Sequence, residues 1–447
     1  MKPIRWFFVL ALTTLAGLAS GGCGNRPANI VSSGETQSAN EPAAADDLIA
    51  RIDASLARVA EFIVSKQSDD GAWRSETYGM FKDGTALTPY VLSALFFIGD
   101  ENSAARRSFR KGTDNLLTWF DENGALRETI AFPVLTAVSA SRMVVLECKD
   151  KERLQAQKSL LEFVLSRQLN SRNGWSADDP EFGGWGFSLD APVKPAAGQL
   201  RERFFESNMV ATIFGIAALQ SARIPKDDPV WSEALVFVKR CQNFSDDPAA
   251  ESAFDDGGFF FIPDEPLQNK AGTAGQDAAG RLRFHSYGTM TADGLRALLQ
   301  CGLPPDHPRA LAALNWLTTH FDPAHNPGRF NAVCGALRDS TYYYWAWSCA
   351  HAFSRIGVRD FQRDGKTVDW ARDLAVELLR RQNPDGSWTN SYTDGREDDP
   401  LVAAPWAASA LAICRATLAG SESNAKGCKP AGAHPRATAQ TETENPR

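Results

Sequence analysis

Titratable side chains that could act on a substrate occur at two places in the second half of the chain. His285 and Asp293 flank the predicted start of a helix, and the segment Asp394-Gly-Arg-Glu397-Asp398-Asp399 ends in three consecutive acids just before another helix. The positive end of a helix disfavours a protonated imidazole, so His285 would be neutral and able to accept a proton. We take His285, Asp293 and Asp398 as candidate catalytic residues. The competing interpretation is that each completes a loop or a helix end.

A second group of residues lies near predicted helix starts and suits ligand binding rather than reaction. The segment Tyr342 to Trp347 has five aromatic residues in six positions, so these side chains must face several directions, some toward a cavity and some toward the core. Aromatic rings can stack on a sugar, line a site for an isoprenoid chain or stabilise a cation. The candidate ligand-binding residues are Glu206, Asn208, Tyr287, Asp339, Tyr342, Tyr343, Trp345 and Trp406.

The cysteines and histidines indicate neither a cofactor nor a metal site. Cys301 and His307 are close in sequence, but His307 falls at a predicted helix start and no third ligand is indicated, whereas zinc sites take at least three protein ligands. Setting Cys23 aside, an odd number of cysteines remains and no disulfide framework follows. Buried free thiols are expected in or at the ends of apolar helical runs, which hold Cys148, Cys301, Cys349 and Cys414.

The elements that would position these residues are helices in pairs. Helical runs alternate with Gly-, Pro- and Asp-rich connections, without a strand-like period of two. The first run of each pair has one apolar stripe and a charged face, and the second is apolar almost all round, which indicates a buried helix. The predicted pairs are 47–66 with 86–98, 104–120 with 129–147, 151–167 with 204–221, 229–241 with 289–300, 308–319 with 340–356, and 367–381 with 401–418.

These pairs predict an all-α fold, an α/α toroid of six helical hairpins with an inner and an outer ring of six helices each. Asp228-Pro229, Asp399-Pro400 and Asp306-His307-Pro308 each place an acid near a first-turn proline, which is typical of a helix start. Asp399 is therefore better explained as a cap than as a catalytic acid. We expect the ligand site at the mouth of the inner ring, where the second helices begin.

A repeated element joins the helical pairs. Gln382-Asn-Pro-Asp-Gly386-Ser-Trp388 matches Gln67-Ser-Asp-Asp-Gly71-Ala-Trp73, with looser versions at Gln168 with Gly174-Trp175 and at Gln242 with Gly257-Gly258-Phe259. This pattern resembles the prenyltransferase and squalene-oxidase repeat family, the toroids that include squalene-hopene cyclase and the β subunits of protein prenyltransferases. The resemblance covers about residues 47–419. The segments Ser286-Tyr-Gly-Thr-Met-Thr-Ala-Asp-Gly-Leu295, Asn326-Pro-Gly328 and Tyr342-Tyr-Tyr-Trp345 resemble an exported bacterial branch of these repeats, which implies no particular activity. The family resemblance implies a terpenoid cyclase/protein prenyltransferase-like toroid.

The motifs that carry the best-known activities of such toroids are absent. The cyclases use an Asp-x-Asp-Asp acid, the prenyltransferase β subunits a zinc site with Asp-x-Cys and a later His, and the thioester proteins a Gly-Cys-Gly-Glu-Gln run, and none of these occurs here. Three functions stay open: binding of an apolar, isoprenoid-like or glycan ligand without cyclase chemistry, an enzyme acting on an isoprenoid lipid by cyclisation or prenyl transfer, and a polysaccharide-degrading enzyme. Whether the chain is an enzyme is thus undecided by the sequence.

The lining of the central cavity separates these functions. A deep apolar cavity with one buried carboxyl group favours an isoprenoid enzyme. An open groove with two facing carboxylates, about 5 to 9.5 Å apart, favours a glycosidase. A cavity with neither arrangement favours a binding protein.

The N-terminus predicts export. A positive start precedes the apolar run 6–18, and small residues lead to Cys23. The segment resembles a bacterial lipoprotein signal, which implies a lipidated Cys23 and a lipid anchor in the cell envelope. If cleavage instead follows a small residue, the protein is secreted and soluble. The predicted divisions are a signal peptide 1–23, a flexible tether 24–45, the toroid 46–420 and a disordered tail 421–447.

Composition supports a large globular core and limits the partners. Of 447 residues 43% are hydrophobic and 23% charged, with a formal net charge of −7 and no basic stripe. Nucleic-acid binding usually needs such a stripe. The expected partners are therefore a small molecule or a glycan and, through the lipid anchor, a membrane. The sequence gives no indication of the oligomeric state.

Overall fold

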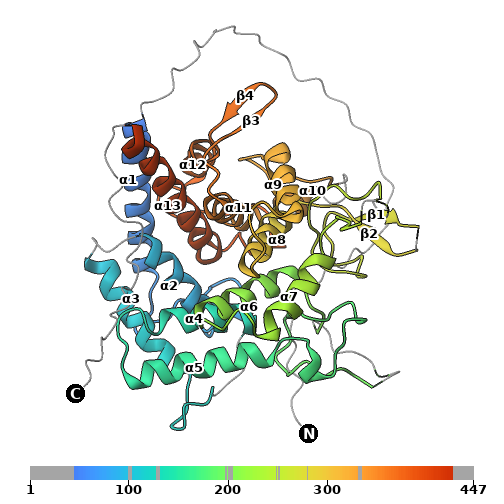
Figure 1. Cartoon of the computed structure of the whole chain (residues 1–447). Coiled ribbons are helices and arrows are strands. Elements are labelled where there is room, and N and C mark those ends of the chain that lie inside the picture. Colours follow the sequence, from blue (N-terminus) through green and yellow to red (C-terminus); the bar gives the residue numbers. More distant parts are fainter. Residues whose placement is uncertain are drawn as a thin grey trace, which may run out of the picture.

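The computed structural model describes residues 45–98, 103–126, 131–196, 199, 205–247, 249, 252–278, 280–330 and 335–425. Six helical hairpins follow one another along this part of the chain (Figure 1). Their first helices are α1 (Ala45–Ser65), α3 (Ser103–Leu117), α5 (Lys151–Ser166), α7 (Pro229–Arg240), α9 (Pro308–His320) and α12 (Trp370–Arg381). Their second helices are α2 (Leu87–Ile98), α4 (Pro133–Met143), α6 (Met209–Ser221), α8 (Gly288–Gln300), α11 (Tyr342–Ile356) and α13 (Pro400–Ala425). A short helix, α10 (Gly335–Asp339), precedes α11.

The second helices close into an inner ring. Helix α2 packs on α4, α4 on α6, α6 on α8, α8 on α11, α11 on α13, and α13 returns to α2. The first helices pack outside this ring: α3 lies against α2, α5 against α4 and α9 against α8, each on the inner helix of the preceding hairpin, and α12 lies against its own partner α13. Burial follows this arrangement, because α6 buries residues on almost every side whereas α12 buries a single stripe that includes Trp370, Leu374 and Leu378. The predicted α/α toroid of six hairpins is confirmed.

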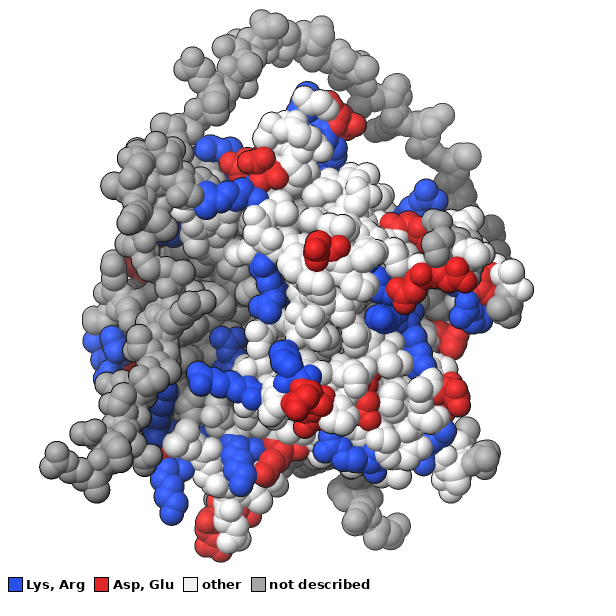
Figure 2. Space-filling model, viewed as in Figure 1, with Lys and Arg blue, Asp and Glu red and all other residues white. Residues whose placement is uncertain are grey.

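Two short β-hairpins contradict the expectation that the chain has no strands. Strand β1 (Thr273–Gln276) pairs with β2 (Leu282–Phe284) between α7 and α8, and β3 (Phe361–Arg363) pairs with β4 (Lys366–Val368) between α11 and α12. Both hairpins project from the helices in Figure 1, and Figure 2 shows acidic and basic side chains on the surface at both places. The turn of the second one is Asp364-Gly365, where both residues have positive φ, as a two-residue hairpin turn requires. Because of this hairpin, α12 begins at Trp370 rather than at the predicted Thr367.

Four glutamine side chains join consecutive hairpins in the same way. Gln382 Nε2 donates to the carbonyl oxygen of Gly386 at 2.9 Å and to that of Ser55 in α1 at 3.1 Å, so the last hairpin is tied to the first. The indole N–H of Trp388 donates to the carbonyl oxygen of Leu378 at 2.8 Å. The pair of glutamine bonds recurs at Gln67 (to Gly71 and Ser108), Gln168 (to Gly183 and Val230) and Gln242 (to Gly257 and Arg309).

The predicted partner of Gln168 is wrong. Gln168 forms an antiparallel bridge with Trp185, not Trp175, because an inserted loop separates the glutamine from its glycine and tryptophan. Gly183 occupies the glycine position with φ of 92°, and a Cβ there would lie 1.8 Å from the carbonyl oxygen of Glu233. Trp175 instead belongs to a separate small cluster with Leu169, Phe182 and Phe205.

Two of the three predicted proline-adjacent caps are confirmed. The Asp228 carboxylate accepts the N–H of Val230 at 2.9 Å, and the Asp399 carboxylate accepts the N–H of Leu401 at 2.9 Å. At α9 the cap is His307, not Asp306, because the imidazole Nδ1 directly before the proline accepts the N–H of Arg309 at 3.2 Å. Asp399 is thus occupied at the start of α13, as the sequence indicates.

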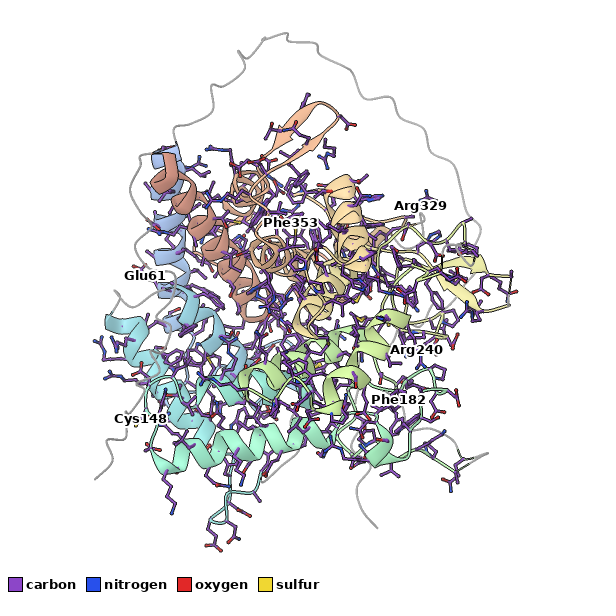
Figure 3. All side chains as sticks on the ribbon, in the orientation of Figure 1. Glu61, Cys148, Phe182, Arg240, Arg329 and Phe353 are labelled. Atoms are coloured by element: carbon purple, nitrogen blue, oxygen red, sulfur yellow. The ribbon has the colours of Figure 1, made fainter. Side chains whose placement is uncertain are left out.

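The cysteines are less uniformly buried than predicted. Cys349 and Cys414 are buried and Cys301 is half-buried, but Cys148 is exposed because α4 ends at Met143 and the chain has already reached the periphery. Figure 3 shows this contrast, with Cys148 and Glu61 at the edge of the molecule and the fully buried Phe353 of α11 inside it. All five cysteines in the described part of the chain are free thiols.

Several predictions lie outside the described residues. They are the signal peptide 1–23 with Cys23, almost the whole tether 24–45, and the tail beyond residue 425. Helix α13 extends to Ala425, past the predicted end at residue 418. Its segment Pro400–Gly420 is long and apolar enough to cross a membrane, but 67% of its most apolar window is buried within the toroid, as expected for a core helix.

Candidate functional site

The inner ring encloses cavities at both ends. Two adjoining cavities, of about 230 and 330 Å³, lie where the inner helices begin; together we call them the apolar chamber. A cavity of about 320 Å³ is lined by the last turns of α2, α4, α6, α8 and α11 and by the middle of α13; we call it the arginine chamber. Helix starts line one end and helix ends the other, so the six inner helices run parallel. The lobes of the apolar chamber share Phe132, Phe187, Val210, Thr341, Tyr344, Gly395 and Arg396.

A layer of aromatic rings separates the two chambers. Trp406 of α13 contacts Tyr90 of α2 edge-on, with ring centroids 4.3 Å apart, and lies 4.5 Å from the ring of Trp347. Trp347 in turn stacks on Tyr344 at 5.5 Å. The residues that line both chambers are Tyr90, Ser139, Phe214 and Trp406.

Helix α11 distributes its aromatic residues between this layer and the core, as the sequence predicted. Tyr344 and Trp347, three positions apart, face the chambers. The other three are buried and each donates a hydrogen bond to a main-chain oxygen: Tyr342 to Pro323 at 2.7 Å, Tyr343 to Thr389 at 3.1 Å and Trp345 to Asp322 at 3.1 Å.

The walls of the apolar chamber are built mainly from hydrophobic side chains. The first turns of all six inner helices contribute to it, and the preceding connections add further aromatic rings. An apolar ligand that covered these rings would be stabilised in proportion to the apolar area removed from water, and the wall offers it few polar partners. The apolar lining residues include Phe81, Leu87, Phe132, Leu135, Phe187, Val210, Phe214, Phe261, Met290, Leu337 and Val402.

One buried carboxyl group lines this chamber. Glu397 is 1% exposed and accepts the main-chain N–H groups of Tyr343 at 3.0 Å and Tyr344 at 2.8 Å, in the first turn of α11. The side-chain amide of Asn390 also donates to it, at 3.2 Å. Burial raises the pKa of Glu397 to about 7, although these three donors favour the carboxylate and limit the rise. Glu397 therefore changes its charge near neutral pH.

A polar group of residues lies at the far lobe of the apolar chamber. The Lys270 ammonium donates to the Thr341 hydroxyl and lies 5.3 Å from the ring centroid of Tyr287. Burial lowers the pKa of Lys270 to about 8, against the charges of Glu397 and other nearby acids. The hydroxyl of Thr289 is buried in the same lobe and has no hydrogen-bond partner among the described residues. These groups are available to bind a polar part of a ligand.

The three candidate catalytic residues are far less accessible than the sequence suggested. Asp293 is fully buried, and its carboxylate accepts hydrogen bonds from Tyr344 at 2.7 Å, Ser348 at 2.5 Å and Arg296 at 3.0 Å. Burial raises the pKa of Asp293, and its three donors oppose the rise. Asp293 lines neither chamber, but two of its partners do: Tyr344 in the apolar chamber and Arg296 in the arginine chamber.

His285 and Asp398 also lie outside both chambers. His285 follows β2, and burial, together with the charge of Arg329, lowers its pKa. The expected direction is thus found, but its physical cause is burial rather than a helix end. Asp398 is half-buried and accepts the phenol O–H of Tyr78 at 2.6 and 2.7 Å. The structure does not bring His285, Asp293 and Asp398 together in one site.

Of the eight candidate ligand-binding residues, Tyr287 and Trp406 line a chamber. Asn208 caps α6 by accepting the N–H of Ala211 at 2.9 Å. Asp339 pairs with Arg338 at 2.6 Å and with His325 at 3.0 Å. Glu206 is half-buried and lines neither chamber, and Tyr342, Tyr343 and Trp345 are the core residues of α11 described above. The chambers therefore depend largely on other residues.

Sequence reasoning missed the polar residues that line the chambers. Glu397 stands in the acidic segment from which Asp398 was selected, and only the fold shows which of these neighbours faces inward. Lys270 lies in a long connection with no periodicity to indicate its direction. Within the described residues, no three His, Cys, Asp or Glu side chains are close enough to hold one metal ion.

Comparisons with known proteins support the fold. No protein-family model and no curated protein sequence matches the chain. The type II terpene cyclase MstE from Scytonema, solved with geranylgeranyl dihydroxybenzoate, superimposes with a TM-score of 0.50 at 12% identity, over 83% of this chain and 99% of that one. An α-1,6-mannanase from Salegentibacter gives 0.49 at 13% identity, over 82% and 99%. The superposition on the terpene cyclase shows a shared toroid fold, and an identity of 12% leaves the activity of this chain undetermined.

Proposed function

We propose that this toroid binds a largely apolar, isoprenoid-like ligand in the apolar chamber and does not carry out cyclase chemistry on it. The observation that carries the proposal is the lining of the chamber, where the first turns of all six inner helices and several phenylalanines present hydrophobic surface. Ligand sites of this kind are concave and mostly apolar, with a few polar groups that orient the ligand.

The polar groups of the far lobe give the ligand an orientation. Lys270 and the unpartnered hydroxyl of Thr289 lie there beside Tyr287. A ligand that carried an oxygen at one end would accept a hydrogen bond from Lys270 and satisfy Thr289, while its apolar part lay against the phenylalanine-rich wall. We therefore expect an isoprenoid with an oxygenated end rather than a pure hydrocarbon.

The character of Glu397 argues against proton-initiated cyclisation. Protonating an alkene needs a strong acid, and a carboxylic acid whose pKa is raised to about 7 is a weaker acid than an ordinary glutamate. Such a group is suited to proton transfer to or from an oxygen near neutral pH. That property favours a second candidate function, an enzyme that acts on an oxygenated isoprenoid with Glu397 as its acid or base.

A polysaccharide-degrading enzyme is less consistent with this site. Asp394 and Glu397 are the carboxylates among the described residues that line the apolar chamber. Glu397 is engaged by three N–H donors, and Asp394 is exposed at the rim. The chamber thus does not present two free carboxylates that face each other across an open groove, as hydrolysis of a glycosidic bond requires.

The repeated glutamine element supports assignment to the prenyltransferase and squalene-oxidase repeat family. In each copy, which we call a clasp, one glutamine side chain donates two hydrogen bonds to main-chain oxygens and so joins two hairpins. The four glutamines are Gln67, Gln168, Gln242 and Gln382. With the lipoprotein-like start at Cys23, this supports a toroid tethered to the cell envelope that presents its chamber to an isoprenoid there. Secretion as a soluble protein is the alternative.

The test is direct recovery of a ligand, followed by binding of a defined probe. The protein is purified natively and extracted with organic solvent, the extract is analysed by mass spectrometry, and binding of geranylgeraniol is then measured by tryptophan fluorescence. Val210→Trp fills the junction of the two lobes, and Val376→Trp on the exposed face of α12 serves as the control. We expect Val210→Trp to weaken binding at least tenfold, equivalent to about 1.4 kcal/mol, and the control to leave it unchanged.

Two results would contradict the proposal. Equal affinity of the two tryptophan variants for geranylgeraniol would show that binding occurs elsewhere. Recovery of oligosaccharides alone, with no affinity for geranylgeraniol, would favour the polysaccharide function. Turnover of the bound isoprenoid that disappears in Glu397→Gln would instead establish the second candidate function.

A further inference from the structure

The arginine chamber collects positive charge without acidic residues in its walls. Arg142 of α4, Arg296 of α8 and Arg355 of α11 all line it, and no Asp or Glu is among its described lining residues. Only Arg296 has a carboxylate partner, Asp293, at 3.0 Å. Three arginines and one carboxylate leave two positive charges without a counter-charge at this site.

The other two arginines have no partner in the described part of the chain. No hydrogen bond or ion pair joins Arg142 or Arg355 to any residue that the structure describes, and both residues keep part of their surface exposed where they line the cavity. Burial lowers the pKa of Arg142, and burial together with the charge of Arg296 lowers that of Arg355. Like charges held together in a partly enclosed space repel one another unless an anion lies between them.

Two uncharged polar groups of the same cavity are also unsatisfied. Gln300 is 7% exposed, and its Oε1 has no hydrogen-bond partner among the described residues; the same holds for Nε2 of His351. Burial, and then the charges of Arg296, Arg142 and Arg355, hold the pKa of His351 well below its usual range. A neutral imidazole can donate from Nε2, and the Gln300 amide can turn its NH2 group inward, so both can contribute hydrogen bonds to an anion.

The helix ends offset part of this charge but leave the arginine N–H donors unpaired. Arg142 and Arg355 lie in the last turns of α4 and α11, where the helix dipole favours a cation. The last turns of five inner helices line the chamber, so their partial negative charges of about half a unit each act together. Among the described residues, however, no carbonyl oxygen of these turns accepts a hydrogen bond from either arginine. An arginine that only interacted with the dipole of its own helix would lie along that helix end. Arg142 and Arg355 instead line one cavity together with Arg296, which comes from α8.

We propose that the arginine chamber is a binding site for a dianionic phosphate group. Two uncompensated guanidinium charges match a phosphate monoester, and guanidinium groups bind phosphate oxygens through paired N–H donors. Arg142 and Arg355 supply the free charges, Arg296 is held in position by Asp293, and Gln300 and His351 complete the donor set. The phosphate is either free in solution, alone or on a small molecule, or part of a lipid headgroup. This site stands apart from the isoprenoid site, because the aromatic layer of Tyr90, Phe214 and Trp406 separates the two chambers.

The test measures binding of inorganic phosphate to the purified protein by titration calorimetry, at constant ionic strength set with chloride. Arg142→Gln and Arg355→Gln each remove one free charge, and Arg51→Gln, on the exposed face of α1, is the matched control. We expect each chamber variant to weaken phosphate binding about tenfold or more, as loss of a charged hydrogen bond does, and the control to bind like the parent. A second arm measures binding to phosphatidylcholine vesicles with and without phosphatidic acid, whose headgroup is a phosphate monoester.

Thermal unfolding with and without phosphate provides a second measure of binding, which applies even to a variant of lowered stability. The melting temperatures of the parent, Arg142→Gln, Arg355→Gln and Arg51→Gln without phosphate provide the reference for each protein. Phosphate should raise the melting temperature of the parent and of Arg51→Gln more than that of either chamber variant. Binding to phosphatidic acid but not to inorganic phosphate would support the site with a lipid as its ligand. Equal phosphate affinity in parent and chamber variants, or no binding in either arm, would overturn the proposal.

Discussion

Glu397 should make the stability of this protein depend on pH in an unusual direction. Burial raises its pKa from the ordinary 4.5 to about 7, so between these values the folded chain holds a proton that the unfolded chain has released. Stability falls with pH wherever the folded state binds more protons than the unfolded state. The free energy of unfolding should therefore decrease as the pH rises from about 4.5 to about 7, and change no further from this group above that range.

The size of the effect follows from the shift. One pKa unit corresponds to about 1.4 kcal/mol, so a rise from 4.5 to about 7 gives a loss of about 3 kcal/mol across the range. Glu397 is 1% exposed, so solvent screens this contribution little. The N–H donors from Tyr343, Tyr344 and Asn390 are already included in the raised pKa, because they favour the carboxylate and oppose the effect of burial.

The measurement compares Glu397→Gln with the parent by urea unfolding at several values of pH between about 4.5 and 8. The glutamine leaves one N–H of the first turn of α11 facing an amide NH2, which lowers stability by a similar amount at every pH. The informative quantity is therefore the difference in unfolding free energy between parent and variant as a function of pH. Glu61→Gln, which removes an exposed acid from α1, is the control for general effects of charge.

Parallel changes in the unfolding free energies of the parent and Glu397→Gln would contradict a raised pKa of Glu397. A constant difference across this range would show that Glu397 is ionised throughout and that the donors at the start of α11 outweigh burial. Glu397 would then be only a structural acceptor, and the second candidate function would lose its acid or base. A difference that falls by about 3 kcal/mol, while Glu61→Gln follows the parent, would leave that candidate standing.

Three further predictions concern the clasp and the far lobe. Trp388→Ala should cost about 3 to 5 kcal/mol by urea unfolding, since the indole is fully buried; a loss below about 1 kcal/mol would show that the clasp does not join the hairpins. Gly183→Ala should cost well over the roughly 1 to 2 kcal/mol of positive-φ strain, because its Cβ would meet Glu233, whereas Gly357→Ala, with open space around it, should cost only that strain. Lys270, with its pKa lowered to about 8, should acylate at pH 8 faster than ordinary lysines, and peptide mass spectrometry that found it slowest would contradict this.

The helices could be predicted because each carried its own local signal. The charged face of α12 and the all-apolar surface of α6 distinguish outer from inner helices, and Asp228 and Asp399 cap the helices that follow them. These are interactions within one element or between its immediate neighbours. The β3–β4 hairpin has a comparable signal in Asp364-Gly365, but each of its strands has only three residues, too few for an alternating pattern to indicate a strand.

The chambers could not be predicted in the same way, because they depend on which side of each inner helix faces the axis. An inner helix that is apolar all round gives no periodicity to indicate that side. Helix α11 was the exception in principle: Tyr344, Trp347 and His351 recur at three and four positions, so they share one face, and all three line a chamber. The predicted ligand-binding residues of this helix, Tyr342, Tyr343 and Trp345, lie away from this face and pack in the core.

Asp293 shows how a residue selected for its chemistry can matter through its position. Its carboxylate holds the phenol of Tyr344, in the wall of the apolar chamber, and the guanidinium of Arg296, in the wall of the arginine chamber. Since it is fully buried, it reaches a ligand in neither chamber. Replacing it would leave both partners without their acceptor and alter both walls together. A ligand in one chamber can thus influence the other by two physical connections: through this carboxylate, and through the aromatic layer whose residues line both chambers.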